Sequence, residues 1–141
     1  MLQPKRVKHR KMHRIKYEGH VKGNSYIAYG QYGIVANEGA WITDRQIEAA
    51  RVAISRNLGK TGKMWIRIFP QMSKTKKPLE VRMGSGKGNP EFWVAVVKKG
   101  TIMFEVSGID KETAYKAFYA AGNKLPITWK FIEKGVANDN K

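Results

Sequence analysis

The sequence contains no cysteine and few acidic residues, and each shortage narrows the classes of protein that it can encode. A chain without cysteine has no disulfide, no thiolate nucleophile and no zinc site built on sulfur ligands. No apolar run approaches the roughly 18 residues that a membrane-spanning helix needs, so no membrane partner is predicted. The basic N-terminus also lacks the apolar segment of a secretory signal.

Positive charge dominates what is present. Lysine and arginine number 27 against 11 acidic residues, which gives a net charge of +16. A compact protein with that much self-repulsion is best explained by a polyanionic partner, and nucleic acid is the leading candidate. Hydrophobic residues make up 42% of the 141 residues, which is enough for the core of one domain. We therefore predict a single domain over 1–141, with a basic arm over 1–16, a glycine-rich loop over 71–90 and a polar tail over 135–141.

Two segments carry helix signals. Thr43 and Gln46 have the spacing of a capping box, and Gly59 has the position of a C-terminal glycine, so a helix is predicted over 43–58. Asp110 is predicted to cap a second helix that runs to about Gly122. The residues predicted to face the core are Ile47, Ala50, Ile54 and Leu58 in the first helix and Ala114, Ala117, Phe118 and Ala121 in the second.

Strand signals occur between and around these helices. Residues 25–35 suggest short bent strands, 63–69 alternates between apolar and other residues, and 127–132 supplies a last strand. The runs 92–97 and 101–106 are joined through Lys98, Lys99 and Gly100, which is typical of a hairpin. The predicted fold class is α+β, with two helices packed on a mixed or mostly antiparallel sheet, a basic extended N-terminal arm and a long glycine-rich loop.

The predicted arm concentrates cations at one end of the chain. It contains Lys5, Arg6, Lys8, Arg10, Lys11, Arg14 and Lys16, and the first acidic residue is Glu18. Such a block repels itself and stays extended until a polyanion neutralises it. His9 and His13 have the spacing of half a metal site, but Arg10 follows His9 where a metalloprotease helix has glutamate. The arm histidines are therefore interpreted as RNA-contacting or solvated, and no metal is predicted.

The glycine-rich loop has Gly84, Gly86 and Gly88 at alternate positions, with Arg82 and Lys87 interleaved. Glycine lets a backbone approach another surface closely, and the two cations indicate an anion. The spacing fits neither the dinucleotide fingerprint nor a P-loop, so a mononucleotide site is excluded.

Other groups leave alternatives open. Arg45 and Arg56 share the exposed face of the first predicted helix, where arginines either contact phosphate or are merely solvated. Tyrosine and tryptophan side chains among the cations either stack on unpaired bases or fill the core, and most are expected to fill the core. For the tyrosines of 26–33 the two interpretations are about equally balanced. The scattered acids and the absence of histidine near Ser85 give no catalytic constellation, so no enzyme and no cofactor are predicted.

Five ordered motifs resemble the bacterial and organellar large-subunit ribosomal protein L sixteen family, and the likeness spans about 1–132. They are Met1–Arg6, Arg10–His13, Gln46–Arg51, Trp65–Arg67 and Pro78–Asn89. The resemblance implies a structural constituent of the large ribosomal subunit that binds rRNA near the peptidyl transferase centre and helps position A-site tRNA. It also implies neighbouring ribosomal proteins as partners and a cytoplasmic bacterial ribosome, or an organellar one, as the location.

The resemblance carries over to individual positions of this sequence. It assigns RNA contacts to the arm residues Lys5, Arg6, Lys8, Arg10, Lys11 and Arg14 and to Arg51 and Arg56 of the first predicted helix. His13 and Arg45, which the arm and the helix face already suggested, complete the predicted RNA contacts. The resemblance assigns the loop toward tRNA or the peptidyl transferase centre to Lys77, Arg82, Met83, Gly84, Gly86, Lys87 and Gly88. Some bacterial members hydroxylate an arginine of this motif, and the matching position is Arg82.

The sequence departs from the family pattern in three places. Ser85 stands where many relatives have a basic residue, 17–41 matches loosely, and 135–141 resembles an added tail. The runner-up hypothesis is a generic basic protein that compacts nucleic acid.

Overall fold

The structure, a computed structural model, describes residues 17, 19, 21, 23, 25–75 and 90–135. The elements, in chain order, are β1 (Tyr32–Ala36), β2 (Ala40–Thr43), α1 (Asp44–Leu58), β3 (Lys63–Ile66), β4 (Met72–Thr75), β5 (Pro90–Val97), β6 (Ile102–Ser107), α2 (Lys111–Gly122) and β7 (Trp129–Glu133).

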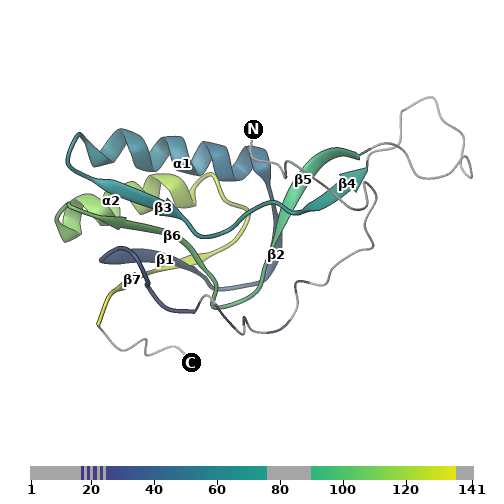
Figure 1. Cartoon of the computed structure of the whole chain (residues 1–141), viewed down its shortest axis with the longest axis horizontal. Coiled ribbons are helices and arrows are strands. Elements are labelled where there is room, and N and C mark those ends of the chain that lie inside the picture. The colour runs from purple at the N-terminus through teal and green to yellow at the C-terminus, as the bar shows by residue number, and fades with distance from the viewer. Residues whose placement is uncertain are drawn as a thin grey trace, which may run out of the picture.

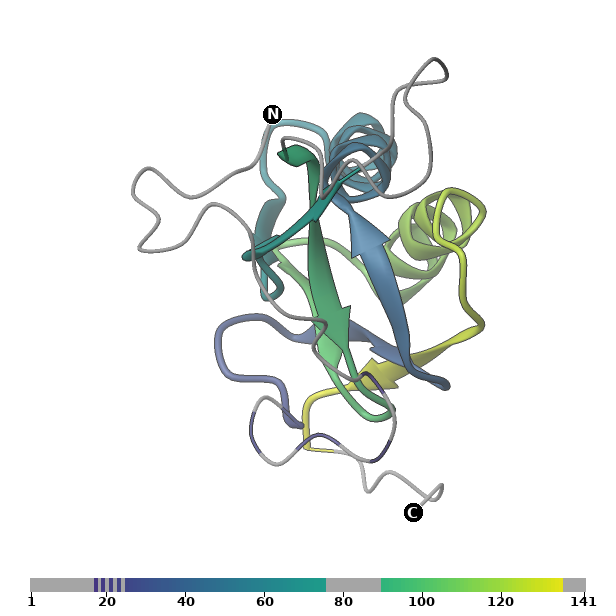
Figure 2. The same cartoon turned by 90° about the vertical axis from the view of Figure 1, so that its right-hand side faces the viewer.

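The strands form two sheets, and every strand pairing in the described part of the chain is antiparallel. One sheet has the order β3-β6-β1-β7 and the other the order β2-β5-β4. Both helices lie over one face of the four-stranded sheet, and the three-stranded sheet lies at one end of it (Figure 1). The view along the helices shows α1 and α2 side by side (Figure 2). The predicted α+β class is confirmed, but the single sheet of that prediction is in fact two.

The helix α1 begins as its sequence predicts. The Thr43 hydroxyl accepts a hydrogen bond from the Gln46 backbone N–H at 3.1 Å, and the Gln46 side chain accepts one from the Thr43 N–H at 2.9 Å. This reciprocal capping box satisfies two N–H groups that have no partner inside the helix. At the other end Gly59 has a φ of +68°, a left-handed value that favours glycine. All four residues predicted to face the core are buried.

The helix α2 also matches its prediction. Asp110 accepts a hydrogen bond from the Thr113 N–H at 3.2 Å, and the four residues predicted to face the core are buried. The C-terminal end of α2 packs closely on β7, where a Cβ on Gly122 would lie 1.9 Å from the indole nitrogen of Trp129. Glycine at this position therefore allows the tryptophan to approach the helix.

The hairpin predicted over 92–106 is wrong. The two strands exist as β5 and β6, but β5 pairs with β2 and β4, whereas β6 pairs with β1 and β3. The turn between them bonds to the end of β1, because the Gly100 N–H donates to the Ala36 carbonyl at 2.8 Å and the Ala36 N–H donates to the Thr101 carbonyl at 2.9 Å. Two strand signals around a glycine thus predicted the turn correctly and the partners incorrectly.

Other strand boundaries also differ from the predictions. The strand predicted over 63–69 ends at Ile66, and β4 occupies 72–75 inside the range predicted as loop. Of the bent strands predicted over 25–35, only β1 forms, and β7 begins two residues later than expected. The remaining predicted loop (76–89), the arm (1–16) and the tail after Gly135 lie outside the described residues.

The face of the four-stranded sheet that points away from the helices holds a buried carboxylate, Glu105 in β6. In register, Glu105 lies between Trp65 of β3 and Gly33 of β1, so these three positions form one row across the sheet. Because Gly33 has no side chain, Ile27 from the preceding segment packs there, within about 3.2 Å of where a Cβ would be. The segment before β1 thereby folds over Glu105, whose exposed fraction is 0%.

The buried carboxylate is fully engaged by donors. Its Oε1 accepts from the backbone N–H groups of Ala28 at 3.2 Å, Tyr29 at 2.8 Å and Gly30 at 2.7 Å, and its Oε2 accepts from the Arg67 guanidinium. Burial alone raises the pKa of a carboxyl group, but the combined hydrogen bonds from Gly30, Tyr29, Arg67 and Ala28 favour the charged form more strongly. The pKa of Glu105 is therefore held below its ordinary value.

Replacing this carboxylate should destabilise the fold in a pH-dependent manner. A group with a lowered pKa in the folded state contributes stability above its unfolded pKa, about 4.3, and that contribution is lost as the pH falls through the folded value. We expect Glu105→Gln to lower the free energy of unfolding at pH 7 by about 1 to 3 kcal/mol, because the amide brings donors toward N–H groups and has only one acceptor oxygen. Urea unfolding at pH 7 and near pH 3 would measure this.

The matched control is Glu112→Gln, which removes an exposed acid from the first turn of α2. Its effect should stay below about 1 kcal/mol. The difference between wild type and Glu105→Gln should shrink as the pH falls. An equal difference at both pH values would contradict the assignment of this stability to the ionised carboxylate.

Candidate nucleic-acid interface

Three side chains cover the buried carboxylate on the outer side of the sheet, and we call them, with Glu105, the Tyr29 cluster. The cluster consists of Tyr29, Trp65, Arg67 and Glu105. Trp65 and Arg67 are two residues apart in extended chain, so their side chains point to the same side. The pairing continues past the end of β3, because the Arg67 N–H donates to the Met103 carbonyl at 2.9 Å.

The tyrosine of this cluster lies on top of the other members. Its ring stacks on Trp65, with centroids 6.1 Å apart and planes at 23°. The guanidinium carbon of Arg67 lies 5.0 Å from the Tyr29 ring centroid, a cation–π distance. Arg67 therefore joins the buried Glu105 to an aromatic ring that remains 62% exposed.

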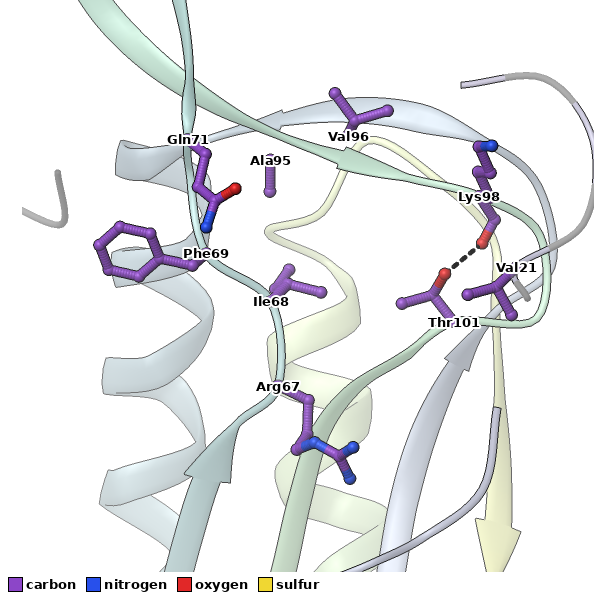
Figure 3. A pocket seen from close by; sticks show the side chains of 9 residues that line it. All are labelled: Val21, Arg67, Ile68, Phe69, Gln71, Ala95, Val96, Lys98 and Thr101. Atoms are coloured by element: carbon purple, nitrogen blue, oxygen red, sulfur yellow. Dashed lines mark hydrogen bonds between the residues drawn. The ribbon is translucent and has the colours of Figure 1, made fainter. Parts of the chain in front are cut away.

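Arg67 also borders a pocket of about 360 Å³ on the same side of the sheet (Figure 3). Figure 3 shows both helices behind the strands and the Arg67 side chain at the lower edge of the residues that line the pocket. The pocket has an apolar floor that includes Ile68 and Ala95, and polar groups at its edge from Gln71 and Lys98. The Lys98 carbonyl is already occupied, since the Thr101 hydroxyl donates to it at 2.7 Å. The pocket thus combines a cation, an amide and apolar surface in one depression.

The exposed face of α1 forms a basic surface. Arg45 and Arg56 are both exposed, and their separation of eleven positions corresponds to about 16 Å along the helix axis. They lie opposite the residues that α1 buries in the core, as predicted.

Arg51, the third predicted contact in α1, is placed differently. Its Nε donates to the Glu48 carboxylate at 2.9 Å, one turn earlier on the helix. This hydrogen bond lowers the pKa of Glu48 and raises the pKa of Arg51. Both side chains are about one third exposed, so the pair is a surface ion pair of small energetic value. Of the three arginines, Arg45 and Arg56 are thus the better placed for phosphate.

Most of the predicted site residues lie outside the described part of the chain. These are the arm residues Lys5, Arg6, Lys8, Arg10, Lys11, His13 and Arg14, and the loop residues Lys77, Arg82, Met83, Gly84, Gly86, Lys87 and Gly88. The charge is divided in the same way. The described residues hold 14 of the 27 lysines and arginines and 8 of the 11 acids, so +6 of the net +16 belongs to them and +10 to the remainder.

The structure separates the aromatic residues that the sequence left undecided. Tyr26 and Tyr29 are 68% and 62% exposed. Tyr32, in contrast, is half-buried and stacks on Phe131 with centroids 5.6 Å apart, and Trp129 is half-buried against α2. Two of the tyrosines in 26–33 are therefore available at the surface, and the third packs on β7.

Sequence reasoning missed Glu105 and Arg67 as site-forming residues. One signal was present for Glu105, since it is the only charged residue in a strand whose other residues are apolar or small. A charged residue inside an apolar strand means either that the segment is not a buried strand or that the charge is buried and paired. Nothing in the sequence indicated that its donors would be three consecutive backbone N–H groups from a segment 75 to 77 residues away.

No group of three or more His, Cys, Asp or Glu side chains in 25–75 and 90–135 is arranged to hold a metal ion. Neither described helix is long and apolar enough to cross a membrane.

The comparisons with known proteins identify the family. A family model described as ribosomal protein L16p/L10e matches residues 4–132. A Mycoplasma genitalium protein named large ribosomal subunit protein uL16 is 71% identical over 134 residues, which cover 95% of this chain and 97% of that protein. The Mycoplasma pneumoniae protein of the same name is 69% identical, with coverages of 95% and 96%. The Malacoplasma penetrans protein is 64% identical over 140 residues, with coverages of 99% and 100%.

These matches confirm the resemblance that the five sequence motifs carry, and they span the folded body as well as the arm and the loop. The chain belongs to the ribosomal protein L16p/L10e family.

Proposed function

We propose that the chain is a structural constituent of the large subunit of a bacterial ribosome, where it binds large-subunit rRNA and helps position A-site tRNA. The observation that carries this proposal is the near full-length identity of 64 to 71% to bacterial proteins named for the large ribosomal subunit. The role is structural rather than enzymatic. Because the Mycoplasma relatives are bacterial, a bacterial ribosome is favoured over an organellar one.

The distribution of charge supports a division of the RNA contacts between segments. The first sixteen residues contain seven lysines and arginines and no acid, so the arm is assigned the deepest contacts with rRNA. The folded body contributes Arg45 and Arg56 on α1, and the Glu48 partner gives Arg51 a smaller share.

The glycine-rich loop is assigned to the functional centre. Its backbone, bare at Gly84, Gly86 and Gly88, would lie against tRNA or rRNA near the peptidyl transferase centre, with Arg82 and Lys87 neutralising phosphate. Arg82 is the position at which hydroxylation is expected, and neighbouring ribosomal proteins complete the set of partners. Both ends of the loop attach to neighbouring strands, β4 and β5, which pair with each other and so fix its base.

The direct test of the proposal is assembly. Tagged protein expressed in a bacterial host should sediment with large subunits and stay bound through a wash at moderate salt. Recovery in the free fraction, together with equal affinity for duplex DNA and rRNA, would instead indicate a generic nucleic-acid compaction protein.

Salt dependence tests the basic face of α1. Each lysine or arginine that neutralises a phosphate releases counterions, so the logarithm of the affinity falls linearly with the logarithm of the salt concentration. We expect the double variant Arg45→Gln and Arg56→Gln to reduce the slope by about 1.4 to 1.8, at roughly 0.7 to 0.9 per phosphate contact. Filter binding to large-subunit rRNA between 50 and about 200 mM salt would measure it.

The control for this experiment removes the same charge elsewhere. The double variant Lys116→Gln and Lys124→Gln changes two exposed lysines at and just beyond α2. It should leave the slope nearly unchanged. If both double variants reduce the slope equally, binding is non-specific and the α1 face has no special role.

The loop is tested by replacing Gly84, Gly86 and Gly88 together by alanine. We expect subunits carrying this variant to bind A-site tRNA more weakly, because three Cβ atoms prevent close approach of the backbone. The thermal unfolding midpoint of the free protein should not change. A large fall in that midpoint would mean that the glycines are needed for folding and not for the approach to tRNA.

A further inference from the structure

Two exposed tyrosines lie on a segment that is held rigidly despite having no regular secondary structure. The segment is 25–31, and it carries Tyr26 at 68% and Tyr29 at 62% exposure. Large aromatic side chains with that exposure lose hydrophobic stabilisation, and here two lie three residues apart.

The backbone around Tyr29 is fixed on both sides. Three consecutive N–H groups, from Ala28 to Gly30, donate to the one Glu105 carboxylate at 3.2, 2.8 and 2.7 Å. Gly30 is so close to β6 that a Cβ there would lie 2.6 Å from the Val106 carbonyl oxygen. Ile27 is buried with 7% exposure and anchors the other side of the segment. The Tyr29 ring is therefore presented by a preorganised backbone, and binding would not have to order it.

The Tyr29 ring packs against two side chains from the sheet. Trp65 and Arg67 point to the same side of the sheet and both contact the Tyr29 ring, at 6.1 Å and 5.0 Å between the stated centres. They support the ring from the sheet side. Since the side chain is still 62% exposed, its accessible surface lies on the outward face of the described molecule.

We propose that the Tyr29 cluster is a stacking site for an unpaired base of RNA. Base stacking on an aromatic side chain needs a fixed ring with accessible surface, and the cluster supplies an anchored backbone and a tyrosine that is 62% exposed. The Arg67 guanidinium supports the ring and is paired with the Glu105 carboxylate, which acts as a positioning residue that holds both the tyrosine backbone and the guanidinium. This inference rests on the proposed function and adds to it a contact that does not depend on phosphate neutralisation.

The positive charge of the chain favours RNA over a protein segment as the molecule that binds the Tyr29 cluster. The net charge is +16, and +6 of it belongs to the described residues that carry the cluster. An approaching polyanion is attracted by that field, whereas a protein partner would have to be strongly acidic to match it. The tyrosines Tyr115 and Tyr119 of α2 are also exposed, but their rings pack against one another and against Trp129, and Arg67 does not lie over either of them.

The test separates stacking from phosphate contacts. We expect Tyr29→Ala to weaken binding to large-subunit rRNA by about 5- to 100-fold, the loss of one stacked base, and to leave the salt slope unchanged because no counterion is involved. Tyr29→Phe should bind like wild type, since the aromatic face remains. Tyr119→Ala is the matched control, because it removes an exposed tyrosine of 57% exposure elsewhere and should leave the affinity unchanged.

A second probe reports on the base itself. A decamer of uridine should bind the wild-type full-length chain more tightly than an abasic decamer with the same number of phosphates. Tyr29→Ala should remove that difference, and Tyr119→Ala should preserve it. Circular dichroism of each variant establishes that it is folded.

The outcomes distinguish this inference from the proposed function. If wild type binds large-subunit rRNA and Tyr29→Ala binds it equally well, the stacking site is overturned while the ribosomal role stands. If Tyr29→Ala leaves rRNA affinity intact but lowers incorporation into large subunits, the cluster contacts a protein and the inference is likewise overturned. If wild type itself fails to bind rRNA, the proposed function fails first.

Discussion

The buried carboxylate of Glu105 is the constraint around which one side of this protein is organised. In a chain of net charge +16, a fully buried negative charge is unusual, and its burial requires that every acceptor position be used. Three backbone N–H groups and a guanidinium satisfy it. The consequence extends beyond stability, because those donors belong to the segment before β1 and to the residue after β3. One carboxylate thus fixes two pieces of chain that no strand pairing holds together.

The two faces of the four-stranded sheet are built on different physical principles. On the helix side, apolar residues of α1 and α2 pack on Ile34, Phe104 and Val106, and shape complementarity is sufficient. On the other side Gly33, Glu105 and Trp65 form a row in which one member has no side chain and another is charged. Packing alone cannot hold such a row. Hydrogen bonds to the Glu105 carboxylate take the place of apolar packing on this face. The Tyr29 ring above the sheet consequently stays exposed.

The sequence predicted where helices and strands form better than it predicted which strands pair with each other. Helix boundaries and core faces were predictable because capping residues and a 3.6-residue period act locally, as Thr43, Gln46 and Ala114 show. The partners of β5 and β6 could not be predicted in the same way, because a turn signal at Gly100 does not reveal that the turn bonds to the end of β1. β4 was missed because a four-residue strand beside a predicted loop carries too little periodicity. The basic face of α1 followed from helical geometry, whereas the Tyr29 cluster combines residues separated by up to 76 positions and has no local signature.

The separation of charge between the folded body and the remaining segments explains how such a basic protein folds at all. Mutual repulsion of 16 excess positive charges would oppose a compact state if they were evenly distributed. The described body instead contains 14 cations and 8 acids, and several of those acids pair with cations, as Glu48 does with Arg51 and Glu133 with Lys111. The arm, by contrast, has no acid among its first sixteen residues. The described body therefore folds with a net charge of only +6, while the arm carries seven cations that no acid within it neutralises.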